Sequence, residues 1–100
     1  MVVELKDQEE WELSSPEGEG LTIPILFASV SAPEKCIVWV WLNDRLVDKV
    51  NLAPGTPHSW WSQTSQSIAF KNALAPGDVL KVKADGSDAD LRIDLDAIPA

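Results

Sequence analysis

The side chains best suited to nucleophilic catalysis are scarce in this chain. It holds one histidine, His58, and one cysteine, Cys36. A catalytic triad needs a base that is held by an acid and faces the nucleophile. The hydroxyl nearest to His58 in the sequence is that of its neighbour Ser59, and adjacent side chains in an extended chain point to opposite sides. We therefore expect no nucleophilic catalysis, an exposed loop position for His58, and an inert buried thiol at Cys36.

Carboxylates are plentiful, but their spacing does not define a site. Asp85, Asp88 and Asp90 surround Gly86 and could offer oxygen ligands to calcium, yet the spacing is not that of an EF-hand loop. Asp94 and Asp96 share one face of a strand, but a glycosidase also needs a large cleft and a desolvated acid. One cysteine and one histidine cannot build a zinc site. We expect a solvated acidic turn, no catalytic residues, no metal and no cofactor.

Tryptophan is the residue type that signals binding. The chain has five tryptophans and no tyrosine. One interpretation divides them between the core and a subunit interface, because large aromatic residues are enriched at interfaces. The other is a flat aromatic platform for sugar rings. The candidate binding residues are Trp39, Trp41, Trp60, Trp61 and Trp11.

The segment from Cys36 to Leu52 should position two of these tryptophans on a β-hairpin. Asn43 and Asp44 tolerate the positive φ angles of a two-residue turn. That turn places Leu42 opposite Arg45, Trp41 opposite Leu46, Val40 opposite Val47 and Trp39 opposite Asp48. One face then carries Ile37, Trp39, Trp41, Leu46 and Val50. The other carries Cys36, Val38, Val40, Leu42 and Val47 with the charges Arg45 and Lys49, so we predict that this second face lies outside, although a one-residue bulge would reverse the assignment.

The first arm of this hairpin is apolar on both faces, so a second sheet or another protein must cover it. Other strands are expected at Leu21–Val30, where Pro24 indicates an edge, a strand start or a bulge, and at 79–84 and 91–95. Strand pairing across the turn at 85–88 would place Lys81 and Lys83 near Arg92 and Asp94. Residues 1–20 are expected to form an acidic N-terminal arm with short strands, and residues 21–100 the main domain. The pattern predicts an all-β, antiparallel, jelly-roll-like β-sandwich of about seven to eight strands.

The charge and composition of the chain argue against some classes of binding partner and against membrane insertion. The net charge is −8 and the isoelectric point is near 4.4, which argues against nucleic acid as a direct partner. No stretch has the length and apolarity of a membrane span. The first residues lack the basic start and apolar run of a signal peptide, so none is expected.

Four segments carry a resemblance to a known group of proteins. They are residues 38–44 (VWVWLND), 50–55 (VNLAPG), 73–84 (ALAPGDVLKVKA) and 89–98 (ADLRIDLDAI). Together they resemble the small β-sandwich structural proteins of tailed bacteriophages, over roughly residues 20–98. The resemblance implies a virion component, such as a capsid decoration (cement) protein, a head–tail joining protein or a fibre-attachment module.

The function expected from these observations is structural. The protein would be a capsid decoration protein that clamps neighbouring capsid subunits on the virion surface, after a stage in the host cytoplasm during assembly. Its partners would be the major capsid protein or another virion protein, and its own copies in a trimer or dimer. The alternative is a carbohydrate-binding or fibre or tail attachment module.

Overall fold

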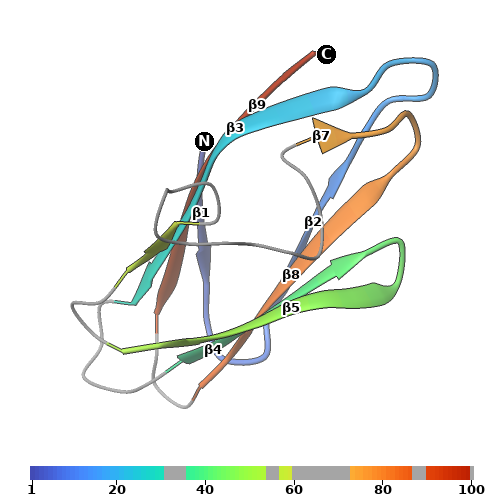
Figure 1. The fold of residues 1–100 in the computed structure, drawn as a ribbon. Coiled ribbons are helices and arrows are strands. Elements are labelled where there is room, and N and C mark those ends of the chain that lie inside the picture. Colours follow the sequence, from blue (N-terminus) through green and yellow to red (C-terminus); the bar gives the residue numbers. More distant parts are fainter. Residues whose placement is uncertain (31–35, 54–56, 60–72, 87–89, 100) are drawn as a thin grey trace.

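The computed structural model describes residues 1–30, 36–53, 57–59, 73–86 and 90–99 and contains only β-strands as regular elements in those ranges (Figure 1). The sequence prediction of an all-β chain is confirmed. The strands are β1 (Val2–Leu5), β2 (Glu10–Ser14), β3 (Leu21–Val30), β4 (Cys36–Leu42), β5 (Arg45–Leu52), β6 (His58–Ser59), β7 (Ala73–Leu74), β8 (Val79–Asp85) and β9 (Leu91–Pro99).

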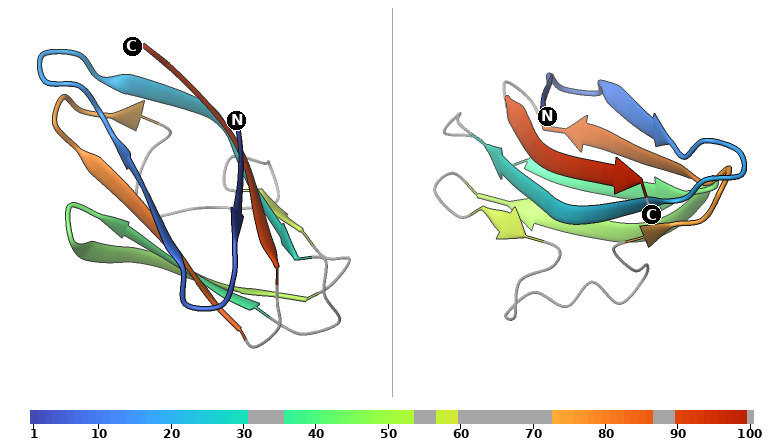
Figure 2. Two further views of the ribbon diagram at one scale, coloured as in Figure 1. Left: turned by 180° about the vertical axis from the view of Figure 1, so that it is seen from behind. Right: turned by 90° about the horizontal axis from the view of Figure 1, so that it is seen from above.

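The strands form two antiparallel sheets that lie as separate layers, as the two views of Figure 2 show. Sheet A has the order β1-β9-β3-β6, and β7 also pairs with β3. Sheet B has the order β2-β8-β4-β5. The predicted antiparallel sandwich is therefore confirmed.

Alternating apolar side chains fill the space between the sheets. In β8, Leu80, Val82 and Ala84 are buried, and in β9 Leu91, Ile93 and Leu95 are buried, as their spacing predicts. Residues two apart in a strand share one face, so each strand contributes one row to the core. The rest of the buried apolar set is Leu5, Ile23, Leu26, Ala28, Val30, Cys36, Val38, Val40, Leu52 and Leu74.

Residues 1–20 supply one strand to each sheet. β1 pairs with β9 in sheet A, and β2 pairs with β8 in sheet B. Leu5 of β1 is buried in the core, and Trp11 and Leu13 of β2 pack against the same core. The segment expected as an acidic arm thus forms one edge of both layers.

The hairpin turn forms as predicted, but the strand register does not hold beyond it. Asn43 and Asp44 have φ angles of 51° and 65°, and Trp41 pairs with Leu46. Next to these pairs the register shifts, so that Val40 pairs with Asp48 and Val47 becomes an extra residue. The predicted pairs of Val40 with Val47 and of Trp39 with Asp48 are wrong because of this β-bulge.

The prediction of which hairpin face lies outside is also wrong. Cys36, Val38 and Val40 are fully buried between the sheets, while Ile37, Trp39 and Trp41 lie on the outer side of sheet B and are half-buried. Downstream of the bulge, Val50 pairs with Val38 and Lys49 with Trp39. Lys49 therefore projects from the same side of sheet B as the tryptophans. The unshifted register places this charge on the opposite face, and the prediction that the opposite face lies outside depended on it.

Two further predictions concern the neighbours of β3, β8 and β9. Pro24 lies where the β3–β9 register shifts between Thr22 and Ile25, which confirms a bulge there. The proposed pairing of 79–84 with 91–95 is wrong. β8 pairs with β2 and β4 in sheet B, whereas β9 pairs with β1 and β3 in sheet A, so Lys81 and Lys83 are in a different sheet from Arg92 and Asp94.

Candidate functional site

The clearest candidate site is a pair of tryptophans on the outer face of sheet B. Trp39 and Trp41 alternate with core residues along β4, which lies between β8 and β5. Their ring centroids are 6.4 Å apart and the ring planes differ by 21°. This is the parallel, stacked arrangement that stabilises aromatic pairs. The sandwich therefore presents two aligned indoles to its surroundings.

Each indole carries a lysine ammonium over its ring. Lys49 Nζ lies 4.7 Å from the Trp39 centroid, and Lys81 Nζ lies 4.8 Å from the Trp41 centroid. Within the described ranges neither lysine forms an ion pair with a carboxylate. A cation over an indole face is a favourable contact that also places aliphatic lysine stems against the rings. These cations compete for the ring faces on which a sugar would stack.

Trp39 is held in place by a hydrogen bond. Its Nε1–H donates to Asp85 Oδ2 at 3.2 Å, and Gln8 Nε2 donates to the other carboxylate oxygen at 2.7 Å. Gly86 follows in the chain and donates its backbone N–H to Asp7 Oδ1 at 2.8 Å. The indole is thus oriented before any partner arrives, which lowers the entropy cost of binding.

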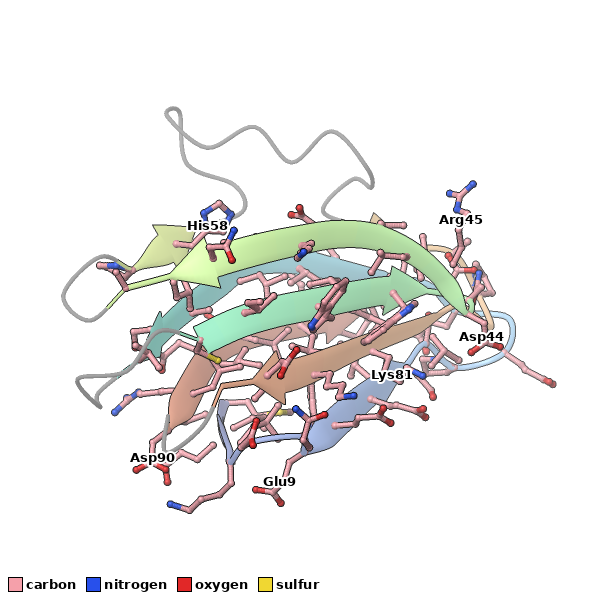
Figure 3. The ribbon with its side chains drawn as sticks, turned by 90° about the horizontal axis from the view of Figure 1, so that it is seen from below. Glu9, Asp44, Arg45, His58, Lys81 and Asp90 are labelled. Atoms are coloured by element: carbon pink, nitrogen blue, oxygen red, sulfur yellow. The ribbon has the colours of Figure 1, made fainter. Side chains whose placement is uncertain are left out.

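The strand register arranges the outer face of sheet B into two rows. One row runs Glu10–Lys83–Trp39–Lys49 across the four strands, and the other runs Glu12–Lys81–Trp41–Leu46. Opposite residues on one face of a sheet are neighbours, so each row places an acid beside a lysine and that lysine beside an indole. We call these eight residues the tryptophan face. Figure 3 looks onto sheet B, and Lys81 lies on the side turned to the viewer.

The structure places three of the five tryptophans that the sequence predicts as binding residues, and it separates Trp11 from the other two. Trp39 and Trp41 lie together on the tryptophan face. Trp11 pairs with Val82 and packs against the core on the opposite side of sheet B. Trp60 and Trp61 lie outside the described residues. Sequence reasoning missed the lysines that cover the indoles, because only the shifted register brings Lys49 beside Trp39.

His58 is not in an exposed loop, so that expectation is wrong. It forms part of β6, pairs with Ala28, and is half-buried. Burial lowers the pKa of His58, and the nearby Asp48 carboxylate opposes this effect. In Figure 3 His58 lies beyond β5, far from Lys81. It is therefore separate from the tryptophan face.

The thiol of Cys36 and the described carboxylates of the acidic turn are either buried or bonded to neighbouring side chains. Cys36 is fully buried, as expected, and burial raises the pKa of its thiol. Of the acidic turn, Asp85 binds Trp39 and Gln8, while Asp90 forms a 2.6 Å ion pair with Lys6; Asp88 lies outside the described residues. No cluster of three metal-ligating side chains occurs within the described part of the chain.

A cavity of about 400 Å³ lies at one end of sheet A. Its charged lining residues are Glu4, Lys6, Glu9, Asp90 and Arg92. Lys6 bridges to Asp90, and Arg92 Nε lies 3.2 Å from Asp94 Oδ2. Both lining cations thus already have carboxylate partners, so neither is free to select an anionic ligand.

No protein-family model, curated protein or solved structure matches this chain. The described residues also contain no helix long and apolar enough to cross a membrane. The site must therefore be interpreted from its own geometry.

Proposed function

We propose that this protein is a non-enzymatic assembly module that docks through the tryptophan face, and that its specific role is capsid decoration in a tailed phage. The observation that supports docking most strongly is the stacked Trp39–Trp41 pair, which is oriented by Asp85 and left on an outer sheet face. Well-buried aromatic residues are frequent binding hot spots, each contributing about 2 kcal/mol or more. The phage role rests on the four resembling segments.

The proposed mechanism is non-covalent. A partner protein covers the indoles and removes them from water, while the surrounding Glu and Lys side chains form a polar rim that fixes orientation. Elsewhere, Glu4, Glu9, Glu17 and Glu19 are exposed. These acids are suited to docking on basic patches of a capsid lattice, where many copies strengthen weak contacts through avidity.

A carbohydrate-binding role is the alternative. The two outward-facing indoles favour it, but they are half-buried, and the ammonium groups over both rings leave less open ring surface for a sugar. We therefore rank protein docking first.

The direct test is binding to undecorated capsids assembled from the major capsid protein of the same genome. Wild-type protein should cosediment with these particles, and the Trp39→Ala/Trp41→Ala double variant should remain folded but lose binding. Ile98→Ala is the matched control, because Ile98 is 53% exposed on sheet A and its loss should leave binding unchanged.

Two results would contradict the proposal. Wild-type protein that does not bind particles would remove the decoration role. Binding that is retained by the folded double variant would exclude the tryptophan face as the docking surface. A change of tryptophan fluorescence on adding a polysaccharide, in the absence of particle binding, would favour the carbohydrate alternative.

A further inference from the structure

The tryptophan face has a charge pattern that is complementary to itself. Acids lie on β2, lysines on β8, indoles on β4, and Lys49 with Leu46 on β5. The face as a whole therefore carries nearly balanced charge although the chain carries −8. A partner that fits it should bear the same pattern in reverse order.

We infer that a second copy of this chain occupies the tryptophan face, packed face to face about a two-fold axis that runs parallel to the strands between β8 and β4. This inference rests on the proposed function, because it takes the same face as the docking surface and names its occupant. Sheets that pack face to face lie about 10 Å apart, with strands within about 30° of each other. The two-fold axis makes every contact occur twice.

This axis reverses the strand order and keeps the rows in register. β2 of one copy lies over β5 of the other, and β8 lies over β4. Glu10 then meets Lys49 of the second copy, and Lys83 meets the second copy's Trp39. In the other row, Lys81 meets the second copy's Trp41, and Glu12 lies over Leu46, which is 48% exposed in the single chain. The arrangement therefore pairs opposite charges, sets cations against indoles and covers an exposed leucine.

Other stackings place like charges together. A two-fold axis across the strands would lay each strand over its own copy, so that Lys81 and Lys83 would face lysines and Glu10 would face a glutamate. Like charges at an interface disfavour that arrangement. Charge complementarity thus selects one axis from the two that stack this face on itself with the strands aligned.

The area of the face sets the expected strength. Four strands about 4.8 Å apart and about 20 Å long give the tryptophan face of one copy an area of roughly 400 Å². The two copies of a dimer would together bury about 800 Å². Stable interfaces bury about 1,200–2,000 Å². We therefore expect a weak, reversible dimer whose contacts gain strength when copies are held close together on a lattice.

The test is sedimentation equilibrium of the full chain, with charge reversals on the two partners of the proposed ion pair. Wild-type protein should show a concentration-dependent dimer. Glu10→Lys and Lys49→Glu should each weaken dimerisation on the order of tenfold or more, because each creates two repelling pairs. An equimolar mixture of these variants should recover the dimer, since one supplies two cations and the other two anions at the same contacts. Glu17→Lys, an exposed residue outside the face, is the control with the same change of charge and should dimerise at least as well as wild type.

A dimer that is weakened in each variant by itself and recovered in the mixture would support the proposed two-fold axis. A wild-type chain that stays monomeric up to about 1 mM would overturn the inference. So would a dimer that either single reversal leaves intact, or a mixture that does not recover. The capsid-binding assay separates this failure from failure of the proposed function: a monomer that binds particles through Trp39 and Trp41 identifies a capsid subunit as the occupant instead.

Discussion

Replacing Trp39 by alanine should cost more folding free energy than replacing Trp41. Both substitutions remove the stacking contact, worth about 0.5–1.5 kcal/mol, and one cation–π contact, worth about 0.5–1 kcal/mol at such a site. Trp39→Ala also removes the hydrogen bond to Asp85, which adds about 1 kcal/mol. These contacts together amount to about 2–3.5 kcal/mol for Trp39→Ala and about 1 kcal/mol less for Trp41→Ala.

Both variants should still fold. A domain of this length has about 5–15 kcal/mol of stability, so a loss of this size leaves the native state populated. For Trp39→Ala the melting temperature should fall by about 10–20 °C, because 1 kcal/mol corresponds to about 4–8 °C at this size. Urea denaturation followed by circular dichroism measures the free energies, and thermal melting gives the second reading.

A double-mutant cycle isolates the Asp85 contribution. In an Asp85→Ala background, the extra cost of Trp39→Ala over Trp41→Ala should disappear, while the lost contact from Gln8 to Asp85 is common to both arms and cancels. Equal costs of the two tryptophan substitutions in the wild-type background would refute the role of this hydrogen bond. Unfolding of Trp39→Ala would show instead that the tryptophan face belongs to the folding core.

Three other predictions test the packing and the backbone. Val38→Thr should destabilise the fold by about 1–3 kcal/mol because it buries an unpaired hydroxyl, whereas Ile37→Thr on the outer face should cost well under half of that; urea midpoints compare them. Because the pKa of His58 is lowered in the folded state, the unfolded chain binds a proton at this imidazole more readily than the folded chain does. The His58 contribution to stability is therefore present above pH 6.5 and is lost as the pH falls through the folded pKa. Urea midpoints measured above and below pH 6.5 should show this loss in wild type and not in His58→Gln. Gly77→Ala should cost about 1 kcal/mol from its φ of 82° alone, because a Cβ there meets no atom within 4 Å, and Gly77→Asn should recover part of the loss in thermal melts.

Local sequence signals predicted the strands of this fold but not how they assemble. The alternation in 79–84 and 91–95 indicated strands and their buried faces, since period two follows directly from the pleat. It could not tell that β8 and β9 belong to different sheets. Pairing across the turn between them would have kept both in one layer, whereas the chain crosses to the other sheet and each strand finds two partners from distant segments.

The candidate site shows the same division between local and distant information. Tryptophans two apart on a strand must share a face, so their pairing was implied by Trp39 and Trp41 alone. The lysine that lies over Trp41 was not implied by the sequence, because Lys81 comes from a strand about 40 residues later and reaches Trp41 only through the β4–β8 pairing. The length and composition of the chain contain no signal of that pairing.

The bulge at Val47 links the core, the tryptophan face and the proposed dimer. With the unshifted register, Lys49 would have paired with Val38, which would put an ammonium and a core valine on one face. The extra residue instead pairs Val50 with Val38 and Lys49 with Trp39. One inserted position thus moves Lys49 from the inner face of sheet B to the indole, and it turns Asp48 of the edge strand to the inner face opposite Val40. A one-residue shift moves every later side chain of the strand to the other face. The same shift puts Lys49 in the row of Glu10, which is the row match that a two-fold copy of this face needs.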